Sequence, residues 1–113
     1  MKPNIAQEQI LTDAMSSERP AIFVSGAAAG IGRACAELFA QQGWFVGLYD
    51  INADGVAALA ASLGKDNATC GTLDVSDEAA WQQALADFWA KSGNRLDILL
   101  NNNAWPATGS PAD

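Results

Sequence analysis

The sequence predicts an α/β protein with a doubly wound parallel sheet, and three observations lead to this class. Four short apolar runs have the length and composition of strands that are buried on both faces. The stretches between them carry apolar residues at helical spacing. Short connections join the segments, and their strict alternation implies right-handed crossovers with helices on both faces of the sheet. The predicted strands are residues 21–25, 44–49, 68–73 and 96–100.

The first strand, residues 21–25, follows Pro20 and leads through a glycine-rich segment into the first predicted helix. The apolar residues of this helix recur at i, i+3, i+4, i+7 and i+8, which predicts one buried face. Gly43 stands where the helix is expected to end. The residues predicted to form the buried face are Ile31, Ala34, Cys35, Leu38 and Phe39.

The second and third helices have polar start signals and glycine stops. We expect Asn52 to cap the second helix and Ser76 to cap the third, with Gly64 and Gly93 ending them. The second helix is expected to bury Val56, Leu59, Ala60 and Leu63, and the third Trp81, Leu85, Phe88 and Trp89. The result is an incomplete doubly wound fold of about four strands and three helices, with the expected strand order 3-2-1-4.

The composition fits one globular domain and excludes several kinds of partner. The 113 residues are 50% hydrophobic and carry a net charge of −7 without any histidine. This charge argues against nucleic acid, no apolar stretch has the length of a membrane span, and no metal site is expected. Cys35 and Cys70 are interpreted as plain buried thiols. We expect a cytoplasmic protein with a leader (1–19), a folded half-domain (20–102) and an irregular tail (103–113).

The segment from Ser25 to Gly32 joins the first strand to the first helix and predicts a dinucleotide site. Gly26 would make the tight turn, Gly30 would let the backbone approach a pyrophosphate, and Gly32 would let the helix close onto the sheet. The N–H groups at the helix start, with Ile31 among them, would bind the phosphates. Glycines also occur in such loops without a ligand, but the position between a strand and an amphipathic helix favours the nucleotide site and a Rossmann-type fold.

Asp50 is a second, independent signal, because it ends the second strand 50 − 32 = 18 residues after the last glycine. A carboxylate there is expected to accept hydrogen bonds from the adenosine ribose hydroxyls, with Ile51 beside it. It would repel a 2′-phosphate, and the nearest base, Arg33, follows the glycine motif, so NAD is expected in preference to NADP. The alternative is a solvated acid at the end of a strand.

Two further pairs follow the third and fourth strands. Asp74 could accept a hydrogen bond from the adenine amino group while Val75 packs on the ring, or Asp74 could simply prepare the helix entry at Ser76. Asn101 and Asn102 could brace loop backbone or contact the cofactor.

These motifs resemble those of the short-chain dehydrogenase/reductase family over about residues 20–102. Its Thr-Gly-x3-Gly-x-Gly motif is matched from Ser25 to Gly32, with serine in place of threonine. Its acid after the second strand is matched by Asp50, its Asp-Val pair by Asp74 and Val75, and its paired asparagines by Asn101 and Asn102. The resemblance implies an NAD-dependent oxidoreductase that transfers hydride between the cofactor and an alcohol or carbonyl substrate.

The sequence departs from the family pattern after Asn102. Asn103 and Ala104 replace the family's Ala-Gly, and the family's later catalytic serine and Tyr-x-x-x-Lys pair are not found. Tyr49 is followed four residues later by Ala53, and its place inside a strand predicts a packing role. We therefore expect no catalytic residue here, and a truncated or frame-shifted copy that is inactive alone and marginally stable.

Two other functional classes stay open. One is a non-catalytic NAD-binding module, and the other is an S-adenosylmethionine-dependent methyltransferase fragment of the same fold. The glycine spacing and the paired asparagines speak against the methyltransferase. The fourth strand would lie at an open edge, so self-association through residues 98–100 is a further expectation.

Overall fold

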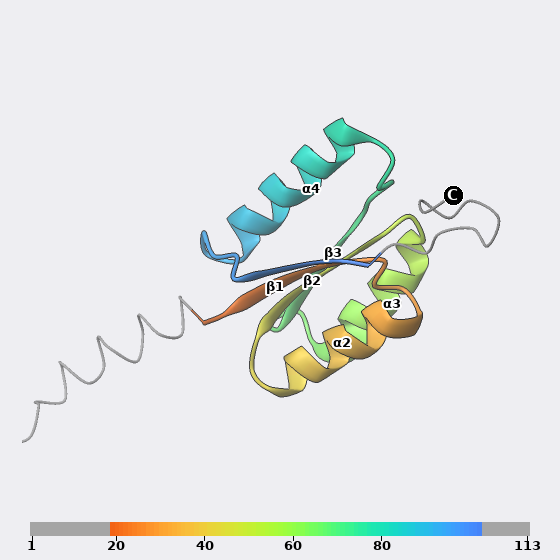
Figure 1. Cartoon of the computed structure of the whole chain (residues 1–113). Coiled ribbons are helices and arrows are strands. Elements are labelled where there is room, and N and C mark those ends of the chain that lie inside the picture. The colour runs from red at the N-terminus through yellow and green to blue at the C-terminus, as the bar shows by residue number, and fades with distance from the viewer. Residues whose placement is uncertain (1–18, 103–113) are drawn as a thin grey trace, which may run out of the picture.

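A computed structural model of the chain describes residues 19–102, which form a four-stranded sheet. Figure 1 shows that this sheet lies between helices. All strand pairs are parallel, and the order is β3-β2-β1-β4, as predicted. The fold class is thus confirmed, while the predicted tail, and all of the predicted leader except Arg19, lie outside the described residues. The elements are β1 (Ala21–Ser25), α2 (Gly30–Gln41), β2 (Phe45–Asp50), α3 (Ala53–Leu63), β3 (Ala68–Thr72), α4 (Glu78–Lys91) and β4 (Ile98–Asn101).

The helices divide between the two faces of the sheet. In Figure 1, α2 and α3 lie below the sheet and α4 lies above it. Successive side chains of a strand point to opposite faces, so Ile22 and Val24 of β1 pack toward α2 and α3. Phe23 of the same strand joins the cluster under α4. Both faces of the two central strands are therefore buried, which is why their sequences are continuous apolar runs.

The face under α4 is aromatic and depends on glycines for space. The rings of Phe23 and Tyr49 stack with centroids 4.5 Å apart, and Phe88 of α4 meets Phe23 edge-on at 5.6 Å. A Cβ on Gly47 would overlap the ring of Phe88, and one on Gly71 would lie 2.7 Å from Cε2 of Tyr49. Tyr49 is 1% exposed, so its predicted packing role is confirmed.

The predicted buried face of α2 is wrong in part. Ile31 is 71% exposed and Leu38 50% exposed, and Ala34 is exposed as well. The fully buried residues of the helix are Gly32 and Ala36. The cause is Gly32, where a Cβ would overlap the carbonyl oxygen of Gly26, so this residue turns toward the fold and sets the rotation of the helix. Cys35 and Phe39 are half-buried as a result, and Cys35 and Cys70 are both free thiols.

The helix starts are confirmed for α3 and corrected for α4. Asn52 caps α3 by accepting the N–H of Gly55 at 3.0 Å. The cap of α4 is Asp77 and not Ser76, because the Asp77 carboxylate accepts the N–H groups of Ala79 and Ala80. On α4, Trp89 is 48% exposed, contrary to its predicted burial. Ala84 and Phe88 are the residues of α4 that are fully buried.

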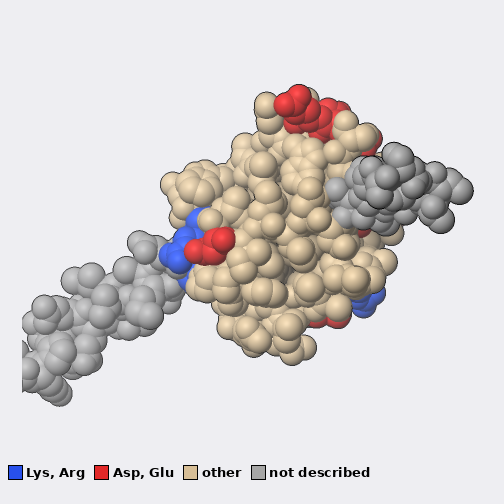
Figure 2. Space-filling view, in the orientation of Figure 1, with Lys and Arg blue, Asp and Glu red and all other residues tan. Residues whose placement is uncertain are grey.

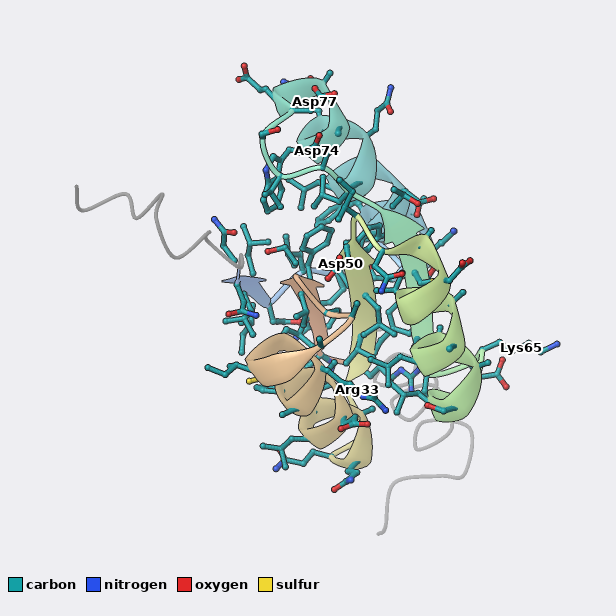
Figure 3. All side chains as sticks on the ribbon, turned by 90° about the vertical axis from the view of Figure 1, so that its right-hand side faces the viewer. Arg33, Asp50, Lys65, Asp74 and Asp77 are labelled. Carbon is teal, nitrogen blue, oxygen red and sulfur yellow. The ribbon has the colours of Figure 1, made fainter. Side chains whose placement is uncertain are left out.

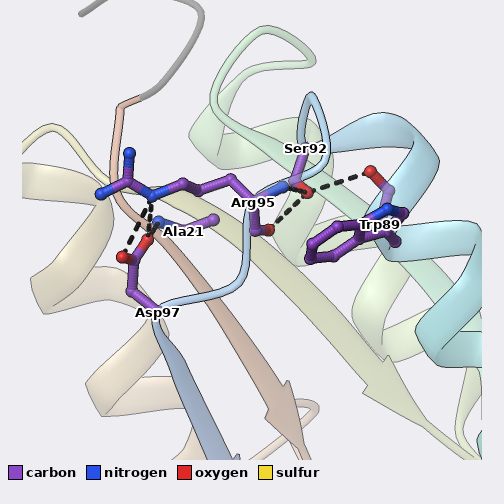
Figure 4. Close-up of polar contacts among 5 residues, drawn as sticks. All are labelled: Ala21, Trp89, Ser92, Arg95 and Asp97. Atoms are coloured by element: carbon purple, nitrogen blue, oxygen red, sulfur yellow. Dashed lines mark hydrogen bonds and ion pairs between the residues drawn. The ribbon is translucent and has the colours of Figure 1, made fainter.

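Polar contacts hold β4 to β1 at the amino end of the sheet (Figure 4). Asp97 Oδ2 accepts the N–H of Ala21 at 2.9 Å, and the Asp97 N–H donates to the Ala21 carbonyl. The Arg95 guanidinium donates to both Asp97 oxygens at 2.8 and 3.0 Å, which lowers the pKa of that carboxyl. Among residues 19–102, no helix is long and apolar enough to cross a membrane.

Candidate functional site

A groove of about 410 Å³ lies at the carboxyl end of the strands, between the starts of α2 and α4. Figure 3 looks onto this end of the sheet, where Asp50 and Asp74 lie, while Lys65 projects away from it. This is the end at which doubly wound sheets bind ligands. The groove is lined by Gly26, Ala29, Gly30, Ile31, Asp50, Ile51, Leu73, Asp74, Val75 and Asn102.

The structure brings eight of the ten predicted site residues to this groove. The side chain of Asn101 and the Cα of Gly32 are not part of the lining; Gly32 packs against Gly26, and Asn101 bonds Ser25. Sequence reasoning missed Ala29 and Leu73, which also line the groove. Two sequence positions could have predicted these residues. Ala29 directly precedes the second glycine of the motif, and Leu73 is the last residue of the third apolar run.

The glycine-rich loop packs against the end of β4. Gly26 has φ +68°, and a Cβ on it would overlap the carbonyl oxygen of Asn102. A Cβ on Gly32 would lie 2.8 Å from the Asn102 amide nitrogen and would overlap Gly26. Gly32 therefore lets α2 close onto the Gly26 turn and Asn102, which refines its predicted role against the sheet. Both glycines are needed by the fold itself.

Gly30 differs from these two glycines because it faces open space. Its φ is +62°, but a Cβ placed on it would meet no atom within 4 Å. Ala29, the N-cap of α2, has extended backbone and provides no side-chain hydrogen bond to the helix. The first N–H groups of an uncapped helix have no intrahelical partner, and the helix dipole favours an anion beside them. The start of α2 is thus free to bind an anion in the groove.

Asp50 lies between the glycine-rich loop and the start of α3. Its Oδ2 accepts the N–H of Ala28 at 3.0 Å and its Oδ1 accepts the N–H of Asn52 at 2.9 Å. A carboxylate has about four acceptor positions, so two remain open to further donors. The neighbouring N–H of Ala27 donates to the carbonyl of Tyr49 at 3.2 Å, which ties the loop to β2 a second time.

Asp74 and Val75 form the wall of the groove that leads into α4. Asp74 Oδ1 accepts the Ser76 hydroxyl at 2.7 Å and the Ser76 N–H at 3.0 Å, and these bonds lower the pKa of the Asp74 carboxyl. The Val75 carbonyl accepts the indole N–H of Trp81 at 2.8 Å. Asp74 therefore does prepare the helix entry, and its contact with an adenine stays a prediction.

The paired asparagines are hydrogen-bonded to the side chain of Ser25, at the end of β1. The buried Ser25 hydroxyl accepts the N–H of Asn102 at 3.0 Å and lies 3.2 Å from Asn101 Oδ1. These bonds join the ends of β1 and β4 directly beneath the Gly26 turn. These bonds are to the Ser25 hydroxyl and not to loop backbone, so the two expected uses stay predictions, and Asn102 lines the groove.

The charges of the groove lining are acidic. Asp50 and Asp74 are its ionisable residues, and no lysine or arginine is among the lining residues. Arg33 lies further along α2 and pairs with Glu37 at 3.4 Å. Figure 2 shows further carboxylates over the start of α4, where Asp77 and Glu78 lie. The lining also exposes three β-branched apolar residues, Ile31, Ile51 and Val75, which suit a flat ring.

Tyr49 is not placed for proton transfer. Its hydroxyl donates to Asp87 Oδ2 at 2.8 Å, within the layer between β2 and α4 and outside the groove lining. Burial is the main cause that raises the pKa of Tyr49 well above its usual value, and the Asp87 carboxylate adds to it. This tyrosine therefore stays protonated in the folded chain.

Known proteins share this arrangement. The family model described as short chain dehydrogenase matches residues 20–112. D-threitol dehydrogenase of Mycolicibacterium smegmatis is 45% identical over 93 residues, which cover 80% of this chain and 35% of that protein. Sorbitol dehydrogenase of Cereibacter sphaeroides is 40% identical over 83 residues, which cover 73% of this chain and 31% of that protein. The chain thus spans about a third of the length of these relatives.

Solved structures agree with the sequence comparisons. The 3-ketoacyl-(acyl-carrier-protein) reductase of Brucella melitensis, complexed with NADH, superposes with a TM-score of 0.68 at 30% identity. That match covers 74% of this chain and 34% of the reductase. The hydroxysteroid dehydrogenase of Escherichia coli gives a TM-score of 0.73 at 27% identity, over 80% of this chain and 40% of that one. The chain belongs to the short-chain dehydrogenase family and carries its amino-terminal, Rossmann-type part.

Proposed function

We propose that this chain is the NAD-binding portion of a short-chain dehydrogenase, in which a bound NAD accepts hydride from an alcohol or NADH returns it to a carbonyl. The observation that carries the proposal is the start of α2, where an uncapped helix end and the open Gly30 face the same groove as Asp50. This donor set fits a pyrophosphate next to a ribose.

The lining and the helix start offer groups suited to each part of the dinucleotide. The N–H groups at Gly30, Ile31 and Gly32 would hold the phosphates. The free acceptor positions of Asp50 would take the adenosine ribose hydroxyls. Ile51 and Val75, both exposed in the lining, would pack on the adenine ring, and Asp74 would accept from its amino group.

The charges favour NAD over NADP. A 2′-phosphate beside Asp50 would meet a second carboxylate at Asp74 and no lining lysine or arginine to neutralise it. Like charges repel, and a partly enclosed groove screens this repulsion less than bulk water does. The name of one further relative, 2-dehydro-3-deoxy-L-rhamnonate dehydrogenase (NAD(+)), supports the same preference.

We propose that the chain on its own binds cofactor without turnover. Its one tyrosine, Tyr49, is buried against Phe23 and hydrogen-bonded to Asp87, so it is unsuited to donate a proton to a substrate. We also propose that the chain associates through β4, where Ile98 is 37% and Leu99 47% exposed at the edge of the sheet. Sedimentation over a range of concentrations tests this association, and a monomer throughout would contradict it.

Calorimetric titration with NAD, NADP and S-adenosylmethionine tests the cofactor proposal. We expect the tightest binding for NAD and at least tenfold weaker binding for NADP, a difference of about 1.4 kcal/mol. The matched control is Gly30→Asp, which places a carboxylate in the open space at the helix start and should abolish binding. Tighter binding of S-adenosylmethionine, or no dinucleotide binding by a folded chain, would overturn the proposal.

A further inference from the structure

We propose that Asp50 is a positioning residue for the glycine-rich loop, because its carboxylate holds the loop in its phosphate-binding shape before any cofactor arrives. This role is distinct from the selection of the ribose by the same side chain. The consequence for binding rests on the proposed function, whereas the effect on the loop concerns the free protein alone.

The contacts of Asp50 reach two loops at once. One oxygen accepts the N–H of Ala28, 22 residues earlier in the chain, and the other accepts the N–H of Asn52 at the start of α3. Hydrogen bonds from backbone N–H groups to a carboxylate are charge-assisted and stronger than bonds between neutral groups. Because Asp50 is the last residue of β2, its position is set by the sheet, and the carboxylate transfers that position to the loop.

Ala28 is the point at which such an anchor has the largest effect. It lies midway between Gly26 and Gly30, and both of these glycines have positive φ. Glycines lose more conformational freedom on folding than any other residue, so a loop bounded by them needs contacts to stay in one shape. The Gly26 side is held by Asn102, but Gly30 meets no neighbour at its Cβ position. The bond from Asp50 therefore fixes the half of the loop that leads into the open end of α2.

This arrangement has a consequence for cofactor choice. A small residue in place of Asp50 removes the repulsion of a 2′-phosphate, but it also releases the N–H of Ala28. Binding to a flexible loop loses affinity because the loop must be ordered at the same time. We therefore expect that Asp50→Ala lowers the affinity for NAD without producing tight binding of NADP.

Hydrogen exchange of the unliganded full chain, measured by NMR, tests the role in the loop. In Asp50→Ala we expect the Ala28 amide to exchange at least about tenfold faster, while the amides of Val24 and Leu48 in the central strands keep their rates. Asp77→Ala is the matched control, since it removes a carboxylate that also accepts two backbone N–H groups but lies at the start of α4. It should leave the Ala28 rate unchanged, and an unchanged Ala28 rate in Asp50→Ala would overturn the proposal.

If Asp50→Ala fails to fold, Asp50→Asn takes its place, because the amide keeps the shape and one acceptor oxygen. One of the two amides at Ala28 and Asn52 should then exchange faster, and full protection of both would contradict the proposal.

A ligand without ribose hydroxyls separates the two roles of Asp50. The probe is 2′,3′-dideoxyadenosine 5′-diphosphate, which keeps the diphosphate and the adenine. If Asp50 positions the loop, Asp50→Ala should weaken this probe at least about fivefold. Unchanged or tighter binding of the probe would mean that the carboxylate acts on the ribose alone. If the wild-type chain binds neither the probe nor NAD, the proposed function fails, and the exchange rates still decide the role of Asp50 in the free protein.

Discussion

The start of α2 and the start of α4 are built in opposite ways. At α4, the Asp77 carboxylate accepts the N–H groups of Ala79 and Ala80 and so satisfies the helix end from within the chain. At α2, Ala29 offers no side-chain cap, and the next residue is a glycine in open space. A side-chain cap stabilises a helix by about 1 kcal/mol, and α2 lacks this contribution at its start. The first N–H groups of α2 thus have no side-chain cap, and the proposed phosphate site rests on this difference.

The open helix end is held in place from both sides. Asn102 packs against Gly26 and Gly32, and Asp50 binds the N–H of Ala28. These contacts hold the loop before α2 in the absence of a side-chain cap. They leave the space beside Gly30 open. The supporting residues, Asp50 and Asn102, come from the ends of other strands and also line the groove.

The largest expected effect comes from two glycine substitutions, one in the loop before α2 and one at the first residue of the helix. In Gly26→Ala the new Cβ overlaps the Asn102 carbonyl at a positive φ, and we expect a loss of about 3 kcal/mol in the free energy of unfolding. Gly30→Ala has the same backbone strain without a clash and should lose about 1 kcal/mol. Urea denaturation measures both values, and equal losses would show that the space around these glycines is not as described.

Alkaline pH should destabilise the α4 side through Tyr49. The folded pKa of this buried tyrosine is raised above its unfolded value near 10, so its contribution is fully present below pH 10 and is lost as the pH rises further. The free energy of unfolding should then fall by about 1.4 kcal/mol per pH unit. Because the chain has one tyrosine, absorbance near 295 nm reports its ionisation directly.

Tyrosinate absorbance should appear only with unfolding. Tyr49→Phe keeps the ring stacked on Phe23 and should remove this alkaline dependence. Ionisation near pH 10 in the folded chain would contradict the burial of the hydroxyl.

Exchanging the cap between the two helices gives an effect of intermediate size. Ala29 has the extended backbone of an N-cap, so Ala29→Asp should cap α2 and stabilise the chain by about 1 kcal/mol. The new carboxylate should also compete with phosphate and weaken NAD binding at least about tenfold. Asp77→Ala should destabilise by about 1 kcal/mol with little change in NAD affinity.

Thermal unfolding measures the stability of both variants, and calorimetric titration measures their affinity for NAD. If Ala29→Asp binds NAD as tightly as the wild-type chain, the start of α2 is not the phosphate site.

The smallest effect on stability is expected for Ile31→Ala. Because this side chain is mostly exposed, the free energy of unfolding should change by less than about 0.5 kcal/mol. A buried isoleucine would lose about 2–5 kcal/mol, which is the result that the apolar periodicity of α2 implied. NAD binding should weaken severalfold through the lost apolar wall, and denaturation and titration of the same sample separate the two effects.

Much of the fold could be predicted from local pattern. The strands have apolar runs because both sheet faces are covered, and Asn52 and the helix-ending glycines act within a few residues of their own positions. Eight of the ten predicted site residues meet at one groove, because the carboxyl ends of parallel strands share an edge. These features depend on short-range sequence or on simple topology.

The errors arise where a distant contact decides. The rotation of α2 is set by Gly32 against Gly26 and Asn102, and periodicity alone assigns Ile31 and Leu38 to the core. The cap of α4 is a local exception, since Ser76 and Asp77 both have cap-forming side chains and it is Asp77 that accepts the N–H groups of Ala79 and Ala80. The bond between Asp50 and Ala28 joins residues 22 apart and follows only from the assembled sheet.

NMR titration of the labelled full chain with NAD tests the central claim most directly. We predict the largest amide shift changes at Gly30, Ile31 and Gly32, where the helix end is open, and no comparable change at Ala79 and Ala80, whose N–H groups already bind Asp77. NADP should require a higher concentration to produce the same changes. Shifts spread equally over both helix starts, or absent from α2 in a folded chain, would contradict the account.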